Sequence, residues 1–299
     1  MQNKKIENIL ECITPNNALP VIFDSPHSGT VYPKNFNYSC DLNNLRKIED
    51  AYIDDLFSAA PNMNAQFLTA LFPRSYIDVN RAIDDIDHTL IDGNWPAHIH
   101  GDITPTSRSD SGIGLISRLI KPGMPIYNRL LCPDEIMNRV KTYYEPYHDT
   151  LCTLLNNAYY AYGKFWHINC HSMPSSSAYP KRKPTLLGNI IRPSDIVLGD
   201  SDGRTCSREF LHTLRDFWTN KGYRVTINDP FKGVELVNRY SRPTQGKNSI
   251  QIEINRALYM NEETGEKNKN YETLKTHCTE MIQTCTVFAQ NNLTNLAAD

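Results

Sequence analysis

Short runs of β-branched and aromatic residues, bounded by Pro, Gly or polar residues, recur along this chain and predict β-strands. They lie at residues 21–23, 66–71, 76–79, 165–170, 223–227 and 249–254. Apolar residues at helical spacing predict helices at 134–162, 204–221 and 272–290. Pro133 suits the entrance of the first helix, Pro146 should kink or divide it, and Gly222 should end the second.

The alternation of strands and helices predicts an α/β fold with a mixed, mainly parallel central sheet and helices on both faces. With 299 residues the chain could form one domain or two small ones. Two segments rich in Pro, Gly and Ser, 94–125 and 174–193, resemble long active-site loops more than linkers. We therefore predict a single domain over residues 1–299.

Charge and composition exclude several classes of partner. The chain has 31 Lys and Arg against 33 Asp and Glu, so it lacks the basic excess of a nucleic-acid-binding protein. No apolar run suits a secretory signal or a bilayer span, so we predict a cytoplasmic protein without a membrane partner. Its 8 cysteines form no CxxC pair and are expected to be reduced. A small-molecule ligand remains the expected partner; the oligomeric state is left open.

Two histidines stand where predicted strands end. His27 lies in the polar turn Ser25–Gly29, and His171 opens the turn that follows strand 165–170. A single histidine of this kind is usually an ordinary turn residue. Because strand ends converge in α/β folds, two such histidines favour a shared metal site.

Glu49 and Asp50 open a short amphipathic helix predicted over 50–57, where acids are favourable against the helix dipole whatever their function. With His27 and His171, one of these carboxylates would complete two nitrogen ligands and one oxygen ligand. Such a set leaves a position open for water, as in catalytic zinc sites. It also accepts cobalt, manganese or iron, so the residues alone do not identify the metal.

Glu253 lies in the last predicted strand, where three isoleucines point to the opposite face. A charged residue on a strand normally faces solvent. In a sheet that is covered on both faces, a carboxylate near a metal could instead serve as the general base.

Arg81 follows the predicted strand 76–79, with Arg74 upstream of the same strand. A guanidinium at such a place suits bidentate binding of a substrate carboxylate. The alternative is a structural salt bridge with one of the neighbouring aspartates, Asp78, Asp84 or Asp85.

Seven short motifs together resemble the N-formylglutamate amidohydrolase family, in the family's order from about Pro20 to Met260. They are Ser-Pro-His-Ser-Gly at 25–29, Arg74 with Asp-Val-Asn-Arg at 78–81, Pro-Tyr-His at 146–148, His-Ser-Met-Pro at 171–174, Leu-Gly-Asp at 198–200, Pro-Phe-Lys-Gly at 230–233, and Gln-Ile-Glu-Ile-Asn-Arg with Leu-Tyr-Met at 251–260.

The resemblance implies a zinc-carboxypeptidase-like (phosphorylase/hydrolase-like) α/β fold. It also implies hydrolysis of the formamide of N-formyl-L-glutamate to formate and L-glutamate, late in histidine degradation. The residues it carries over are the metal ligands His27, Asp50 and His171 for one divalent zinc, the base Glu253, and the carboxylate-binding Asn80 and Arg81. A second contact to the dicarboxylate substrate is left open among Arg74, Arg192 and Arg239.

One loop departs from the family pattern. Many members read Lys-Gly-Gly where this chain has Lys232-Gly233-Val234, so a different loop shape is expected. The departure keeps two alternatives open: a related metallohydrolase for another N-acyl amino acid or short peptide, and a binding protein that has lost catalysis. The intact His27, His171 and Glu253 argue against the second.

Overall fold

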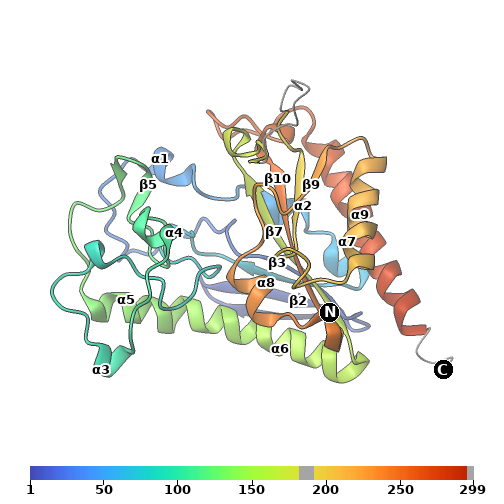
Figure 1. The fold of residues 1–299 in the computed structure, drawn as a ribbon, viewed down its shortest axis with the longest axis horizontal. Helices are drawn as coiled ribbons and strands as arrows, with labels where there is room; N and C mark the ends of the chain where they lie inside the picture. The colour runs from blue at the N-terminus through green and yellow to red at the C-terminus, as the bar shows by residue number, and fades with distance from the viewer. Residues whose placement is uncertain (182–191, 295–299) are drawn as a thin grey trace.

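The computed structural model describes residues 1–181 and 192–294. In this part of the chain an eight-stranded sheet has the order β1-β2-β4-β3-β7-β10-β8-β9 (Figure 1). Its strands are β1 Gln2–Ile6, β2 Leu10–Thr14, β3 Val21–Ser25, β4 Gln66–Ala70, β7 Phe165–Met173, β8 Ile196–Gly199, β9 Val225–Ile227 and β10 Lys247–Asn255.

The four central strands, β4, β3, β7 and β10, are parallel to one another, as are β8 and β9. The pairs β1–β2, β2–β4 and β10–β8 are antiparallel, which makes the sheet mixed. This arrangement confirms the predicted sheet, although the sequence patterns missed β1, β2 and β8. Since parallel neighbours end at the same edge, the carboxyl ends of four strands meet there.

The predicted strand 76–79 is wrong. Residues 76–79 form buried turns, in which Tyr76 N–H donates to the Pro73 carbonyl and Asp78 N–H to that of Leu115. Tyr76, Ile77 and Val79 are apolar because this loop passes through the core, not because it pairs in the sheet. An apolar run of four residues cannot distinguish these two situations.

The first predicted helix is α5 Pro133–Arg139, a π-helical turn η3 Val140–Tyr144 and α6 Glu145–Tyr162. The π turn ends two residues before Pro146, which has no N–H to continue the bonding pattern. The other two are α7 Arg208–Asn220 and α9 Tyr271–Thr294, and the helix expected at 50–57 is only α2 Ile53–Leu56. Among the described residues no helix is long and apolar enough to cross a membrane.

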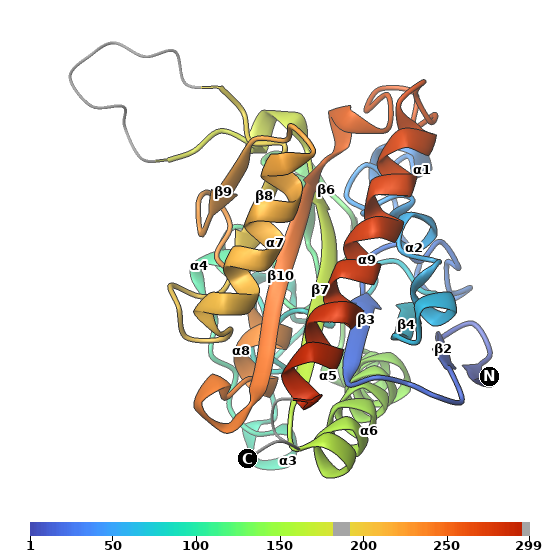
Figure 2. The same cartoon turned by 90° about the vertical axis from the view of Figure 1, so that its right-hand side faces the viewer.

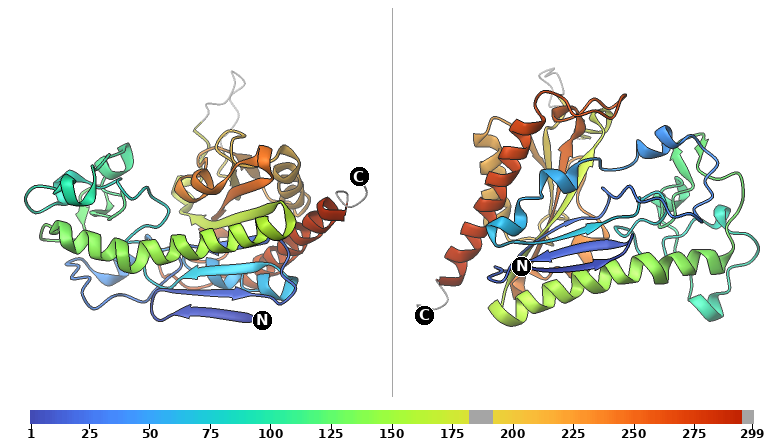
Figure 3. Two further views of the ribbon diagram at one scale, coloured as in Figure 1. Left: turned by 90° about the horizontal axis from the view of Figure 1, so that it is seen from below. Right: turned by 180° about the vertical axis from the view of Figure 1, so that it is seen from behind.

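The sheet is covered on both faces (Figures 2 and 3). Buried side chains of α2, α7 and α9 pack on one face, against Phe23, Ile168 and Ile252. The side chains of α6 pack on the other face, against Ile22 and Leu68. The predicted α/β class with helices on both faces is therefore confirmed.

The remaining elements lie in connections. They are α1 Leu42–Arg46, η1 Ala60–Met63, η2 His88–Leu90, α3 Ala97–His100, α4 Ser107–Asp110, β5 Leu119–Lys121, β6 Met124–Pro125, η4 Ser175–Ser177, α8 Glu235–Tyr240, η5 Pro243–Gln245 and η6 Arg256–Leu258. The predicted loop 94–125 thus contains two short helices and a hairpin. Residues 182–191, half of the predicted loop 174–193, lie outside the described residues.

Candidate active site

A cavity of about 740 Å³ lies at the carboxyl ends of the central parallel strands. The chain leaves β3 for β4 on one side and later returns as β7 on the other side of β3. Such a reversal of direction opens a crevice above the sheet, where α/β proteins bind their ligands. The cavity is lined by residues that include His27, His171 and Glu253.

The turn after β3 fixes His27 next to Asp50. Asp50 N–H donates to the His27 carbonyl over 3.0 Å, and the Ser28 hydroxyl donates to the Asp50 carbonyl over 2.9 Å. Gly29 allows the turn to lie against the end of β4, because a Cβ there would stand 2.3 Å from the Phe72 carbonyl oxygen. These two hydrogen bonds hold the turn that carries His27 against the segment that carries Asp50.

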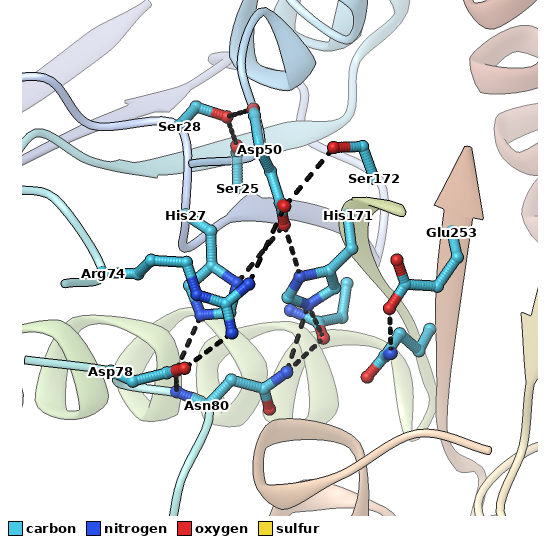
Figure 4. Close-up of polar contacts among 12 residues, drawn as sticks. Ser25, His27, Ser28, Asp50, Arg74, Asp78, Asn80, His171, Ser172 and Glu253 are labelled. Carbon is cyan, nitrogen blue, oxygen red and sulfur yellow. Dashed lines mark hydrogen bonds and ion pairs between the residues drawn. The ribbon is translucent and has the colours of Figure 1, made fainter. Parts of the chain in front are cut away.

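His27, Asp50 and His171 face one another, and all three are buried (Figure 4). Nδ1 of His27 lies 3.3 Å and Nδ1 of His171 3.0 Å from Oδ2 of Asp50. One ligand atom from each residue lies within 4.8 Å of the others. Two imidazole nitrogens and one carboxylate oxygen so placed fit a divalent metal of the zinc type.

The second nitrogen of each imidazole has a partner of its own. Nε2 of His27 lies 2.7 Å from Oδ1 of Asp78, and Nε2 of His171 lies 2.6 Å from Oδ1 of Asn169. These oxygens accept hydrogen bonds, so each Nδ1 is left with its lone pair toward Asp50. Asp78 therefore orients the imidazole of His27.

Two arginines compensate the buried acids. Arg74 lies 2.7 Å from Oδ2 of Asp78 and 3.7 Å from Oδ1 of Asp50, and Arg256 lies 2.9 Å from that same Asp50 oxygen. Burial alone would raise the pKa of Asp50, but its contacts with His171 and His27 and the charge of Arg74 hold that pKa well below the usual value. Asp50 therefore stays ionised although it is buried. Our sequence reasoning missed Arg256, although it directly follows the strand of Glu253.

Glu253 stands beside the three potential ligands. β10 pairs with β7 in a register that places Glu253 opposite His171. Gln251 donates to Oε1 of Glu253 over 2.8 Å. Burial raises the pKa of Glu253 to about 7, although the neighbouring His171 and Arg74 oppose the shift. A carboxylate with a pKa near neutrality is suited to accept and return protons.

Arg81 is buried at the cavity wall, and one of its terminal nitrogens makes only a long ion pair with Asp78. Nε donates to the Ile113 carbonyl over 3.1 Å and one terminal nitrogen donates to that of Asn80 over 3.0 Å, while the other lies 4.0 Å from Asp78. Burial lowers the pKa of Arg81 in spite of the Asp78 charge. The salt bridge with Asp78 that the sequence left open is therefore present but long, and a guanidinium with one such weak contact in a cavity is suited to bind an anion.

The other predicted substrate residues differ in their surroundings. Asn80 lines the cavity, but its Oδ1 accepts from Leu236 N–H over 3.0 Å and its amide nitrogen lies 3.4 Å from Asn169 Oδ1. Arg239 pairs with Glu235 and does not line the cavity, and Arg192 is exposed.

Comparisons with known proteins identify the family of this chain. The sequence model of the family described as N-formylglutamate amidohydrolase matches residues 19–260. The chain belongs to this family.

Among its relatives are the N-formylglutamate deformylases of Pseudomonas aeruginosa (strain PAO1) and Pseudomonas putida. The first is 25% identical over 252 residues, which cover 82% of this chain and 84% of that protein. The second is 24% identical over 251 residues, which cover 82% and 83%. The crystal structure of the N-formylglutamate amidohydrolase of Ralstonia eutropha JMP134 is similar with a TM-score of 0.88 and 38% identity, covering 95% of this chain and 99% of that one.

In this member of the N-formylglutamate amidohydrolase family, the carboxylate that faces the two histidines is that of Asp50. The neighbouring Glu49 points elsewhere, because its carboxylate accepts from the Tyr32 hydroxyl over 2.5 Å and from Arg46 Nε over 3.4 Å. Burial raises the pKa of Glu49.

The loop in which this family member departs from the common pattern needs only one glycine. Gly233 has φ +93°, where a side chain is strained, and a Cβ there would stand 2.6 Å from Val237. Val234 has a negative φ of −131°, so no left-handed backbone conformation requires glycine at this position. The valine therefore fits the loop and lines the cavity.

Proposed function

We propose that this protein hydrolyses the formamide bond of N-formyl-L-glutamate to formate and L-glutamate. The observation that carries the proposal is the convergence of His27, Asp50 and His171 beside Glu253 in one cavity of an amidohydrolase-family chain. The names of the similar Pseudomonas and Ralstonia proteins support this substrate.

We propose His27, Asp50 and His171 as ligands of one divalent metal, zinc. Such an ion would polarise the formyl carbonyl and increase the acidity of water. Glu253 accepts a proton from the attacking water as the oxygen adds to the formyl carbon. It then returns the proton to the amine nitrogen when the C–N bond breaks, which gives formate and free glutamate.

Arg81 is the proposed contact for one substrate carboxylate, with Asn80 holding the loop on which it lies. Arg74 is already paired with Asp78 and Asp50, which disfavours it as the second contact. Arg108 lines the same cavity, and its charge adds to the lowering of the pKa of Arg81. Among the described residues no carboxylate lies within ion-pair distance of Arg108. We therefore propose Arg108 for the second carboxylate.

Formate release tests the proposal. The purified protein is assayed with N-formyl-L-glutamate as isolated, after chelation, and after zinc is restored. We expect release that chelation abolishes and zinc restores, and no release by Glu253→Gln. A metal-containing protein that releases no formate would contradict the substrate and favour a related N-acyl amino acid or short peptide, for which the cavity has room. A protein without metal and without activity would favour the binding-protein alternative.

A place late in histidine degradation and in the cytoplasm remains part of the proposal. Growth on histidine by a strain that lacks the gene would test the first, and cell fractionation the second.

A further inference from the structure

Below the cavity, the polar side chains of β7 continue into the protein interior. His167 and Asn169 alternate with apolar residues along the strand, and both are completely buried, as is Asp24 on β3. None of the three lines the cavity. Buried polar groups are costly unless each has a partner, so their arrangement calls for an explanation.

Asp24 fixes the direction of the Asn169 amide. Its Oδ1 lies 2.8 Å from the Asn169 amide nitrogen and 2.9 Å from Nε2 of His167, and its Oδ2 accepts from the Tyr147 hydroxyl over 2.7 Å. Burial alone would raise the pKa of Asp24, but the His167 charge and these hydrogen bonds lower it. An ionised carboxylate only accepts, so the NH₂ group of Asn169 must face Asp24 and its oxygen must face away.

The Asn169 oxygen in turn meets Nε2 of His171 at 2.6 Å. Because this oxygen only accepts, the hydrogen of the neutral imidazole lies on Nε2 and the lone pair on Nδ1. We infer that Asp24 and Asn169 are positioning residues that hold His171 in the tautomer and orientation required of a metal ligand. This inference rests on the metal site of the proposed function.

One neighbour offers a competing arrangement. The amide nitrogen of Asn80 lies 3.1 Å from Nε2 of His171. If Asn80 donated to Nε2, the imidazole hydrogen would lie on Nδ1 and point at Asp50, where the metal should be. The contact with Asn169 is 0.5 Å shorter (3.1 against 2.6 Å), and Asn80 can donate to the same Asn169 oxygen at 3.4 Å. The distances therefore favour Asn169 as the partner of His171.

The affinity for zinc tests the inference without reference to turnover. We expect Asn169→Leu, which removes the acceptor at similar volume, to weaken zinc binding by about 10- to 100-fold in competition with a chelator. Asn169→Asp keeps an oxygen toward His171 and can share a proton with Asp24, so we expect it to bind zinc within about threefold of the wild type. Tyr147→Phe removes another hydrogen bond of Asp24 and is the matched control, with unchanged zinc affinity.

Two further measurements complete the experiment: the absorption spectrum of bound Co²⁺ reports on the metal site, and thermal unfolding shows whether each variant is folded. A folded Asn169→Leu with wild-type zinc affinity and an unaltered Co²⁺ spectrum would overturn the inference and leave the proposed function intact. If Asn169→Leu does not fold, Asp24→Asn replaces it. In that variant the side-chain amide of Asn169 is free to flip, because position 24 no longer only accepts hydrogen bonds. An unchanged zinc affinity of Asp24→Asn would also overturn the inference. A wild-type protein that binds neither zinc nor Co²⁺ would overturn the proposed function itself, and the inference with it.

Discussion

The two faces of β7 are equally buried, but they consist of different side chains. Trp166, Ile168 and Cys170 point toward α7 and α9 and contact other apolar residues. His167, Asn169 and His171 point toward α6 and are engaged in hydrogen bonds. Burial therefore does not distinguish the core from the site; the partners of each side chain do.

We expect the reaction to depend on the polar face of the sheet. Glu253, which lies opposite His171 on the neighbouring strand β10, is the residue whose substitution, Glu253→Gln, tests this most strongly. The amide cannot accept the water proton, so we expect kcat to fall by about 10²- to 10⁴-fold while zinc content stays unchanged. Ile252→Val, on the other face of the same strand, is the control and should retain its kcat. Comparable activity of Glu253→Gln and wild type would remove Glu253 from the mechanism.

The apolar face should carry stability. Ile168→Ala leaves a cavity between β7 and α9, and we expect a loss of about 2–5 kcal/mol in the free energy of unfolding, measured in urea. Activity per folded molecule should not change, since Ile168 does not line the cavity. A lower kcat in the fully folded variant would show that the two faces are coupled.

A smaller effect is expected from Arg108, which lines the cavity. Arg108→Gln should raise KM for N-formyl-L-glutamate by about tenfold, because a peripheral, partly hydrated ion pair contributes on the order of 1 kcal/mol. KM for N-formyl-L-methionine, which has a single carboxylate, should change little. Arg239→Gln, outside the cavity, is the control; equal effects of Arg108→Gln on both substrates would argue against a second carboxylate contact.

The smallest effect concerns His148 of α6. Burial lowers the pKa of His148 to about 4, below its ordinary value of about 6.5, so the imidazole is neutral in the folded protein. As the pH falls below 6.5 the unfolded chain takes up a proton that the folded protein does not, and stability decreases until the pH reaches about 4. We expect this histidine to contribute about 1 kcal/mol of the loss between pH 7.5 and 5.5.

His148→Gln should reduce that loss, as measured by urea unfolding at the two pH values. An identical pH dependence in the variant would mean that folding does not lower the pKa of His148.

The sequence predicts the regular elements best where the pattern is long. The helical spacing over 134–162 leads to α5 and α6, and the apolar runs at 165–170 and 249–254 lead to β7 and β10. The run at 76–79 fails because a buried loop has the same composition as a strand. β1 is missed because its side chains are mostly exposed and its sequence has no apolar pattern.

The site is predictable where polar residues lie near the ends of strands. His27 follows β3, but the turn expected at His171 is wrong, because β7 continues to Met173 and His171 is its third residue from the end. The choice of Asp50 over Glu49 depended on the family resemblance, since adjacent acids are indistinguishable by pattern. The partners of the ligands were missed, because contacts such as Asp78 with His27 depend on side-chain direction in a folded loop. A signal for Asn169 was present, since polar residues at 167, 169 and 171 alternate with apolar ones in a central strand.

The order of strands has a consequence for biosynthesis. The proposed ligands and base come from positions between His27 and Glu253, and β3 can pair with β7 only after the long helical segment α5–α6 has been made. Contacts between such distant parts of a chain form late and slowly in folding. A nascent chain that ends before β10 lacks the proposed base and exposes one edge of β7. The proposed base therefore joins the three proposed metal ligands only after the chain has been made through Glu253.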